Sequence, residues 1–77
     1  MPPRHLARRI RDLRRRAELT QTDLAAKVGL SRIYIAKLEA GERRAPSLDA
    51  LERLAKALGT TLIELLDPKA KMAKKGR

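Results

Sequence analysis

One segment, residues 20–41, constrains the fold of this 77-residue chain more than any other: TQTDLAAKVGLSRIYIAKLEAG. Its apolar and capping residues predict one short helix that follows Thr20 and ends at Gly29, and another that follows Ser31 and ends near Ala40. Thr20 and Ser31 are residue types that cap helix N-termini, and Gly29 can adopt the left-handed conformation at no steric cost. The segment therefore predicts two short helices joined by a tight glycine turn.

The rest of the chain predicts three more helices and no convincing strand. Apolar residues at helical spacing, bounded by capping residues or glycine, mark these helices: residues 5–17, 47–59 and 61–66. Arginines occupy most of the remaining surface of the first one. We therefore expect an all-α fold class, with one five-helix domain at residues 1–66 and a basic flexible tail at residues 67–77.

The charge balance points to the kind of partner. Nineteen Lys and Arg against nine Asp and Glu give a formal net charge of +10, which indicates a polyanion. Nucleic acid is the leading candidate, and an anionic membrane surface is the second.

Several other classes lack support in the sequence. The chain has no cysteine and a single histidine, His5, so neither a disulfide framework nor a histidine-based metal site is expected. No apolar run is long enough for a membrane span, and neither a glycine-rich phosphate loop nor a zinc signature is present. The carboxylates have no nucleophile or histidine at a suggestive spacing. We therefore expect a protein that is not an enzyme, needs no cofactor, binds no evident small-molecule ligand, and is cytoplasmic and nucleoid-associated.

The helix expected at residues 31–40 has two different sides. At about 100° per residue, Ile35 and Leu38 share its inner side. Tyr34 and Glu39 flank the outer side, which carries the remaining residues: Arg32, Ile33, Ala36, Lys37 and Ala40. In a chain of this charge, such a helix pair predicts insertion of the second helix into the major groove of DNA.

Residues 7–66 resemble the lambda-repressor-like, or Cro/CI-type (XRE), helix-turn-helix family. The resemblance rests on the run RRIRDLRRRAELTQTDLAAKVGLSRIYIAKLEAGERRAPSLDALERLAKALGTTLIELL. The SRIYI segment is also similar to the short controller proteins of restriction-modification systems. The resemblance implies a bacterial or phage regulator of transcription. It would bind double-stranded DNA as a homodimer on a pseudo-palindromic operator.

The resemblance also implies which residues contact DNA. Gln21 would touch a phosphate, and Arg43 and Arg44 would contact the backbone beyond the third helix. The residues that would read base edges lie at the start of that helix and one turn later: Ser31, Arg32, Ile33, Tyr34 and Lys37. The guanidinium of Arg32 suits guanine and the side chain of Ile33 suits a thymine methyl group. Packing within the domain is the open alternative for Ile33 and Tyr34.

Other charged residues receive different roles. The resemblance places Arg14 and Glu39 across the first and third helices as a structural ion pair, so Arg14 is not expected to bind DNA. The remaining arginines of the first helix are interpreted as a solvated, helix-favouring surface, and His5 as an ordinary surface residue. Glu18 stands where the family usually has glycine. If the left-handed conformation is kept there, glutamate costs roughly 1 kcal/mol relative to glycine.

The last helix has one apolar residue more than its inner side needs. Leu62, Leu65 and Leu66 can all face the core, whereas Ile63 then points elsewhere. This surplus predicts a homodimer interface formed by Leu62, Ile63 and Leu66, with a monomer that exposes one isoleucine as the alternative.

Two other functions stay open. The chain could be the antitoxin of a toxin–antitoxin pair, which binds a toxin protein and autoregulates its operon. Alternatively, its arginine-rich first helix could lie on an anionic membrane. The little that the chain has beyond the DNA-binding unit argues against the first, and the complete five-helix layout argues against the second.

Overall fold

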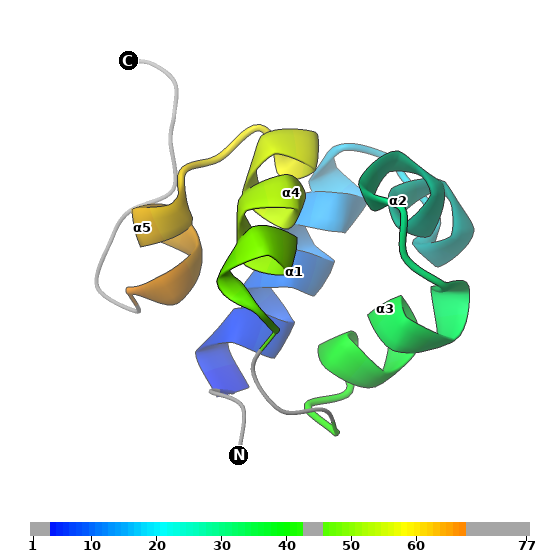
Figure 1. The fold of residues 1–77 in the computed structure, drawn as a ribbon, viewed down its shortest axis with the longest axis horizontal. Coiled ribbons are helices and arrows are strands. Elements are labelled where there is room, and N and C mark those ends of the chain that lie inside the picture. The colour runs from blue at the N-terminus through cyan, green and yellow to red at the C-terminus, as the bar shows by residue number, and fades with distance from the viewer. Residues whose placement is uncertain (1–3, 43–45, 68–77) are drawn as a thin grey trace.

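The computed structural model describes residues 4–42 and 46–67, and in these ranges the chain is entirely helical apart from its turns (Figure 1). The five helices follow one another with short connections: α1 (Arg4–Arg16), α2 (Gln21–Val28), α3 (Arg32–Glu39), α4 (Leu48–Leu58) and α5 (Leu62–Leu66). The expected all-α class is confirmed. Arg43, Arg44 and residues 68–77, which include nearly all of the expected tail, lie outside the described residues.

Local hydrogen bonds fix where the helices begin. Side-chain oxygens accept a backbone N–H at the start of the last four helices, from the caps Thr20, Ser31, Ser47 and Thr61. The cap of α2 is reciprocal, because the Thr20 hydroxyl accepts from the Asp23 N–H and the Asp23 carboxylate accepts from the Thr20 N–H, both at 2.9 Å. The backbone N–H of Thr20 holds the pKa of Asp23 below its usual value. The capping residues in the sequence were therefore sufficient to predict where these four helices begin.

Two turns need the left-handed conformation. Gly29, between α2 and α3, has a φ of 71°, which glycine adopts without strain. Glu18, between α1 and α2, has a φ of 60° and is the one non-glycine residue with a positive φ in the described ranges. The turn therefore keeps the backbone that the family usually gives to glycine, and the glutamate bears the steric cost.

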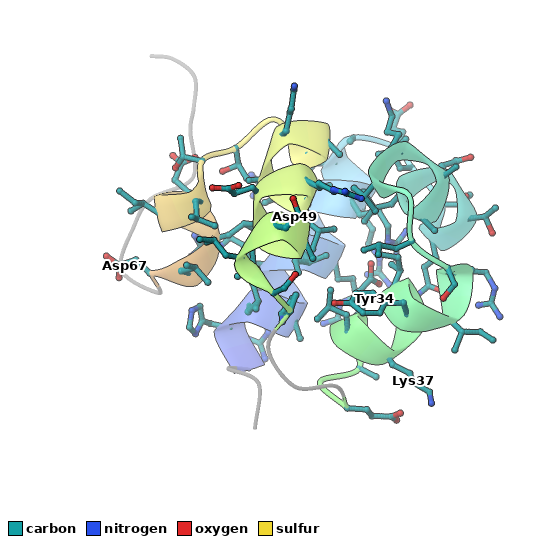
Figure 2. All side chains as sticks on the ribbon, viewed as in Figure 1. Tyr34, Lys37, Asp49 and Asp67 are labelled. Carbon is teal, nitrogen blue, oxygen red and sulfur yellow. The ribbon has the colours of Figure 1, made fainter. Side chains whose placement is uncertain are left out.

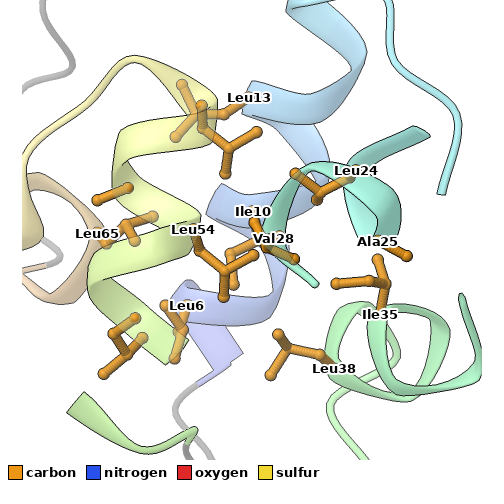
Figure 3. Close-up of a cluster of buried hydrophobic side chains, with 13 residues drawn as sticks. Leu6, Ile10, Leu13, Leu24, Ala25, Val28, Ile35, Leu38, Leu54 and Leu65 are labelled. Carbon is orange, nitrogen blue, oxygen red and sulfur yellow. The ribbon is translucent and has the colours of Figure 1, made fainter. Parts of the chain in front are cut away.

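The core is aliphatic and draws on every helix (Figure 3). Its largest fully buried side chains are Leu6, Ile10, Leu24, Ile35, Leu38, Leu54 and Leu65. Burying each leucine or isoleucine contributes roughly 1.5–3 kcal/mol before the entropy cost of folding. α3 enters this core through Ile35 and Leu38, so its position is fixed from one side only.

α5 is held in place by α1 and α4. A helix of five residues is too short to be stable alone. Leu65 is completely buried, the Arg9 guanidinium donates to the Glu64 carbonyl, and the His5 imidazole Nε2–H donates to the Leu66 carbonyl. His5 lies at the surface, but the expectation that it has no particular role there is wrong, because its ring caps the end of α5.

Candidate nucleic-acid interface

The two sides of α3 differ sharply in exposure. On the inner side Ile35 and Leu38 are 0% and 1% exposed, whereas Ile33 on the outer side is 59% exposed. Arg32 and Lys37 are also exposed. Figure 2 shows Lys37 projecting away from the other helices, while Tyr34 lies toward the body of the domain. The structure thus brings Arg32, Ile33 and Lys37 together on one outward-facing surface.

Two of the expected site residues, Ser31 and Tyr34, also have structural roles within the domain. The Ser31 hydroxyl accepts the Tyr34 N–H at 3.0 Å and so caps α3. The Tyr34 ring is half-buried and packs against the core, so packing accounts for much of this side chain. Arg43 and Arg44 lie outside the described residues.

A buried ion pair locks α3 against α1. The Arg14 Nε donates to Glu39 Oε2 at 2.6 Å and an Arg14 terminal nitrogen donates to Glu39 Oε1 at 3.0 Å, a two-pronged contact. The other terminal nitrogen of Arg14 donates to the Leu19 carbonyl at 2.8 Å. The hydrogen bond to Glu39 raises the pKa of Arg14. Arg14 is thus committed to the fold, as the resemblance implied.

Gln21 connects this ion pair to the outer side of α3. Its amide nitrogen donates to Glu39 Oε1 at 3.2 Å, and its amide oxygen accepts from an Arg32 terminal nitrogen at 3.5 Å. The chain of contacts therefore runs from the buried Arg14 through Glu39 and Gln21 to the exposed Arg32. Sequence reasoning missed this link, although Gln21 and Arg32 each open one of two helices joined by a tight turn.

The described residues offer no other obvious chemistry. No group of three or more His, Cys, Asp or Glu side chains within residues 4–42 and 46–67 is arranged to hold a metal ion. None of the helices in these ranges is both long and apolar enough to cross a membrane.

Comparison with known families decides the classification. A helix-turn-helix family model matches residues 10–65, which contain α2, the glycine turn and α3. The chain belongs to the lambda-repressor-like (XRE) helix-turn-helix family. This helix-turn-helix protein is 45% identical over 56 residues to an uncharacterized HTH-type transcriptional regulator of Sinorhizobium fredii. The aligned residues cover 73% of this chain and 71% of that protein. The family is one of transcriptional regulators with a DNA-binding fold and not of enzymes, which confirms the expectation from the sequence.

Solved structures agree on the fold. The P22 c2 repressor, crystallised with a synthetic operator, superposes with a TM-score of 0.78 at 31% identity over 83% of this chain and 96% of that one. The restriction-modification controller protein C.AhdI of Aeromonas hydrophila gives a TM-score of 0.75 at 37% identity over 80% of this chain and 92% of that one. Against the immunity repressor of Bacillus phage phi105, 46% identical over 54 residues, the helix-turn-helix chain spans only 37% of the relative's length.

Proposed function

We propose that this helix-turn-helix protein regulates transcription as a homodimer on a pseudo-palindromic operator, with α3 in the major groove. The observation that carries the proposal is the outer side of α3. It exposes Arg32, Ile33 and Lys37 on a helix whose inner side is fixed by the core and by the Arg14–Glu39 pair. The B-DNA major groove is wide enough to admit such a helix.

Each exposed side chain has a suitable partner in that groove. The Arg32 guanidinium can pair with the O6 and N7 of guanine, and Ile33 can contact a thymine methyl group. Lys37 would bind a phosphate or a guanine. Gln21 opens α2, where backbone N–H groups and the helix dipole favour a phosphate oxygen. We assign further backbone contacts to Arg43 and Arg44, and contacts at base edges to Ser31 and Tyr34.

The dimer is assigned to α5. Ile63 is 70% exposed and Leu66 is 38% exposed, so α5 presents an apolar surface that a second copy of the chain would cover. Leu62 is half-buried and packs against the core, so it supports this surface from beneath more than it contributes to it. In a two-fold dimer the two α3 helices would lie about 34 Å apart, one turn of DNA.

The relatives' own descriptions support the same function. The P22 c2 repressor was solved on a synthetic operator, and the phage phi105 relative is an immunity repressor. We extend DNA binding from these proteins to this chain because the outer side of α3 exposes both polar and apolar side chains, Arg32, Ile33 and Lys37.

Selection of binding sites from random duplex DNA tests the proposal. We expect enrichment of an inverted repeat whose half-site centres are about 10–10.5 base pairs, or a multiple, apart. Failure to enrich any motif would overturn sequence-specific regulation, and a single unrepeated half-site would overturn the dimer.

The dimer surface has a matched control within the chain. Ile63→Lys should shift the sedimentation equilibrium of the free protein toward monomer, because a charged side chain would have to be buried between the two copies. Leu48, 60% exposed at the start of α4, provides the control. Leu48→Lys should leave the self-association constant unchanged, and equal effects of the two substitutions would exclude α5 as the interface.

A further inference from the structure

Three arginines form a stripe along α1. Arg8, Arg11 and Arg15 follow one another at steps of three and four residues, which places them on one face of the helix. Arg8 and Arg15 are exposed and Arg11 is half-buried. These three residues, called here the α1 arginine stripe, are distinct from Arg14, whose side chain turns into the ion pair with Glu39.

The stripe borders a groove that separates it from α3. Two adjoining hollows, each of about 260 Å³, lie between the two helices and share Arg11, Glu39 and Ala40 in their walls. One continues past Arg15 to Gln21, and the other continues past Arg8. Apart from Glu39, whose carboxylate is bound to Arg14, the wall on the α3 side is made of small residues, Ala36, Ala40 and Gly41. Among the described residues of α3, no long side chain other than that of Glu39 therefore lines the approach to the arginines.

The groove is lined by more positive than negative side chains. Its one lining carboxylate, Glu39, already binds Arg14, and no ion pair within residues 4–42 and 46–67 involves a member of the stripe. The Arg11 Nε–H is buried and has no acceptor among the described residues. Three neighbouring guanidinium groups and an unsatisfied buried N–H are unfavourable in the free protein. A row of anionic oxygens along the groove would relieve the repulsion between the guanidinium groups.

The groove also lies at the edge of the DNA-reading surface. Arg32, Ala36 and Ala40 recur every four residues and form the border of the outer side of α3 toward α1. A helix in the major groove has a phosphate backbone along each of its sides. The backbone on the side of Gln21 would continue into the groove beside Arg11 and Arg15.

We infer that the groove between the α1 arginine stripe and α3 binds the phosphate backbone that flanks the major groove occupied by α3. The inference rests on the proposed function and adds a binding surface to it. It replaces the interpretation of Arg8, Arg11 and Arg15 as a solvated helix surface. Phosphate contacts of this kind set affinity and register, and they carry no base preference of their own.

A lipid surface fits the groove less well than DNA does. An amphipathic helix on a membrane inserts large apolar side chains next to its cations. The exposed large apolar residues in the described ranges are Ile33, Leu48, Ile63 and Leu66, and none of them belongs to α1. A recessed groove beside α3 suits a phosphodiester chain better than a flat surface of headgroups.

The test is the salt dependence of DNA binding in single-charge variants of the full chain. The probe is the duplex recovered by the selection above, with a random-sequence duplex of equal length alongside. Arg8→Gln, Arg11→Gln and Arg15→Gln are compared with Arg16→Gln, which removes an exposed α1 arginine that lines neither hollow. Circular dichroism checks that each variant is folded, and the exposed Arg8 and Arg15 keep the test valid if the Arg11 variant is unstable.

We expect each stripe variant to lower the slope of log K against log[salt] by about 0.9 for each phosphate that it no longer neutralises, or about 1.8 for a dimer in which both protomers carry the substitution. Arg15→Lys should retain most of the parent slope, because it keeps the charge. The selected base motif should not change. Ethylation interference should disappear at the phosphates flanking one edge of each half-site.

Three other results would contradict the inference or the proposed function. If the stripe variants have the same slope of log K against log[salt] as Arg16→Gln, while the parent still selects a motif, the groove is not a phosphate site. The proposed function would survive that result. If the parent selects no motif, the proposed function fails first. Binding to phosphatidylglycerol vesicles that depends on Arg8 and Arg15, without an effect of these residues on DNA binding, would assign the stripe to a membrane and overturn the inference.

Discussion

Two isoleucines on the same helix have opposite environments. Ile35 of α3 is completely buried between α1, α2 and the rest of the core, whereas Ile33, two positions earlier, is 59% exposed. Two residues on a helix differ by about 200° in direction, so one side chain faces the protein while the other faces outward. The burial of Ile35 contributes to folding, and the exposure of Ile33 contributes nothing to it. The inner side of α3 thus contributes to stability, and the recognition that we propose is assigned to its outer side.

Arg14 and Arg32 also differ in exposure and in the hydrogen bonds that they make. Arg14 is 9% exposed and donates hydrogen bonds through all three guanidinium nitrogens. Arg32 is exposed, and its hydrogen bond to Gln21 is long at 3.5 Å. Arg14 therefore holds α3 against α1, and the proposed function requires Arg32 to exchange Gln21 for a base.

The largest expected effect is on the inner side. Glu39→Ala should lower the free energy of unfolding by about 3–5 kcal/mol, because it leaves Arg14 charged, buried and unpaired. Urea denaturation measures the loss. The matched control is Asp49→Ala, which breaks the exposed Arg53–Asp49 pair and should cost at most about 1 kcal/mol. Equal losses for the two variants would refute a special role for the buried pair.

On the outer side, Arg32→Ala should relax the preference for one base position in each half-site by about 1–3 kcal/mol. The free energy of unfolding should stay within about 0.5 kcal/mol of the parent, because the side chain is exposed. Competition binding with single-base variants of the selected duplex measures the first effect. An unchanged preference at every position would remove Arg32 from the reading surface.

The turn before α2 offers a smaller gain in stability. Glu18→Gly should raise the free energy of unfolding by up to about 1 kcal/mol, because glycine adopts the observed φ of 60° without a steric cost. Glu18→Ala is the control, since it removes the charge but keeps the Cβ. A gain of equal size from alanine would attribute the effect to the charge and not to the backbone.

The smallest effect concerns pH and the two capping boxes. The Thr20 N–H lowers the pKa of Asp23, and hydrogen bonds from the Thr60 hydroxyl and the Thr61 N–H lower that of Glu64. A carboxyl group whose pKa is lowered by folding stabilises the protein at pH values above its usual pKa. This stabilisation is lost as the pH falls through the folded-state pKa. Unfolding free energy should therefore decrease below about pH 4. Asp23→Asn combined with Glu64→Gln should flatten that decrease, and an identical profile would contradict these caps.

Features that depend on neighbouring residues along the chain could be predicted from the sequence. Thr20, Ser31 and Gly29 define the ends of α2 and α3 because a cap needs only the residues of the next or preceding turn. The inner position of Ile35 follows from helical spacing. The Arg14–Glu39 pair came from the family resemblance and not from spacing, because its members are 25 residues apart.

Features that depend on which surfaces meet could not be predicted. A helical repeat places Arg8, Arg11 and Arg15 on one face but does not reveal that small residues of α3 lie opposite. Likewise, the capping of α5 by His5 joins residues 61 positions apart. In each case the tertiary arrangement supplies the partner that local reasoning lacks.

Paired measurements on Ile33→Ala and Ile35→Ala test the separation of the two sides of α3 most directly. Unfolding free energy and the motif selected from random duplex DNA are determined for both variants. We predict that Ile35→Ala loses about 2–5 kcal/mol of stability and keeps the parent motif, measured at a temperature where it is folded. Ile33→Ala should stay within about 0.5 kcal/mol of the parent and lose a thymine preference. An Ile33→Ala variant with an unchanged motif, or one as unstable as Ile35→Ala, would contradict the account.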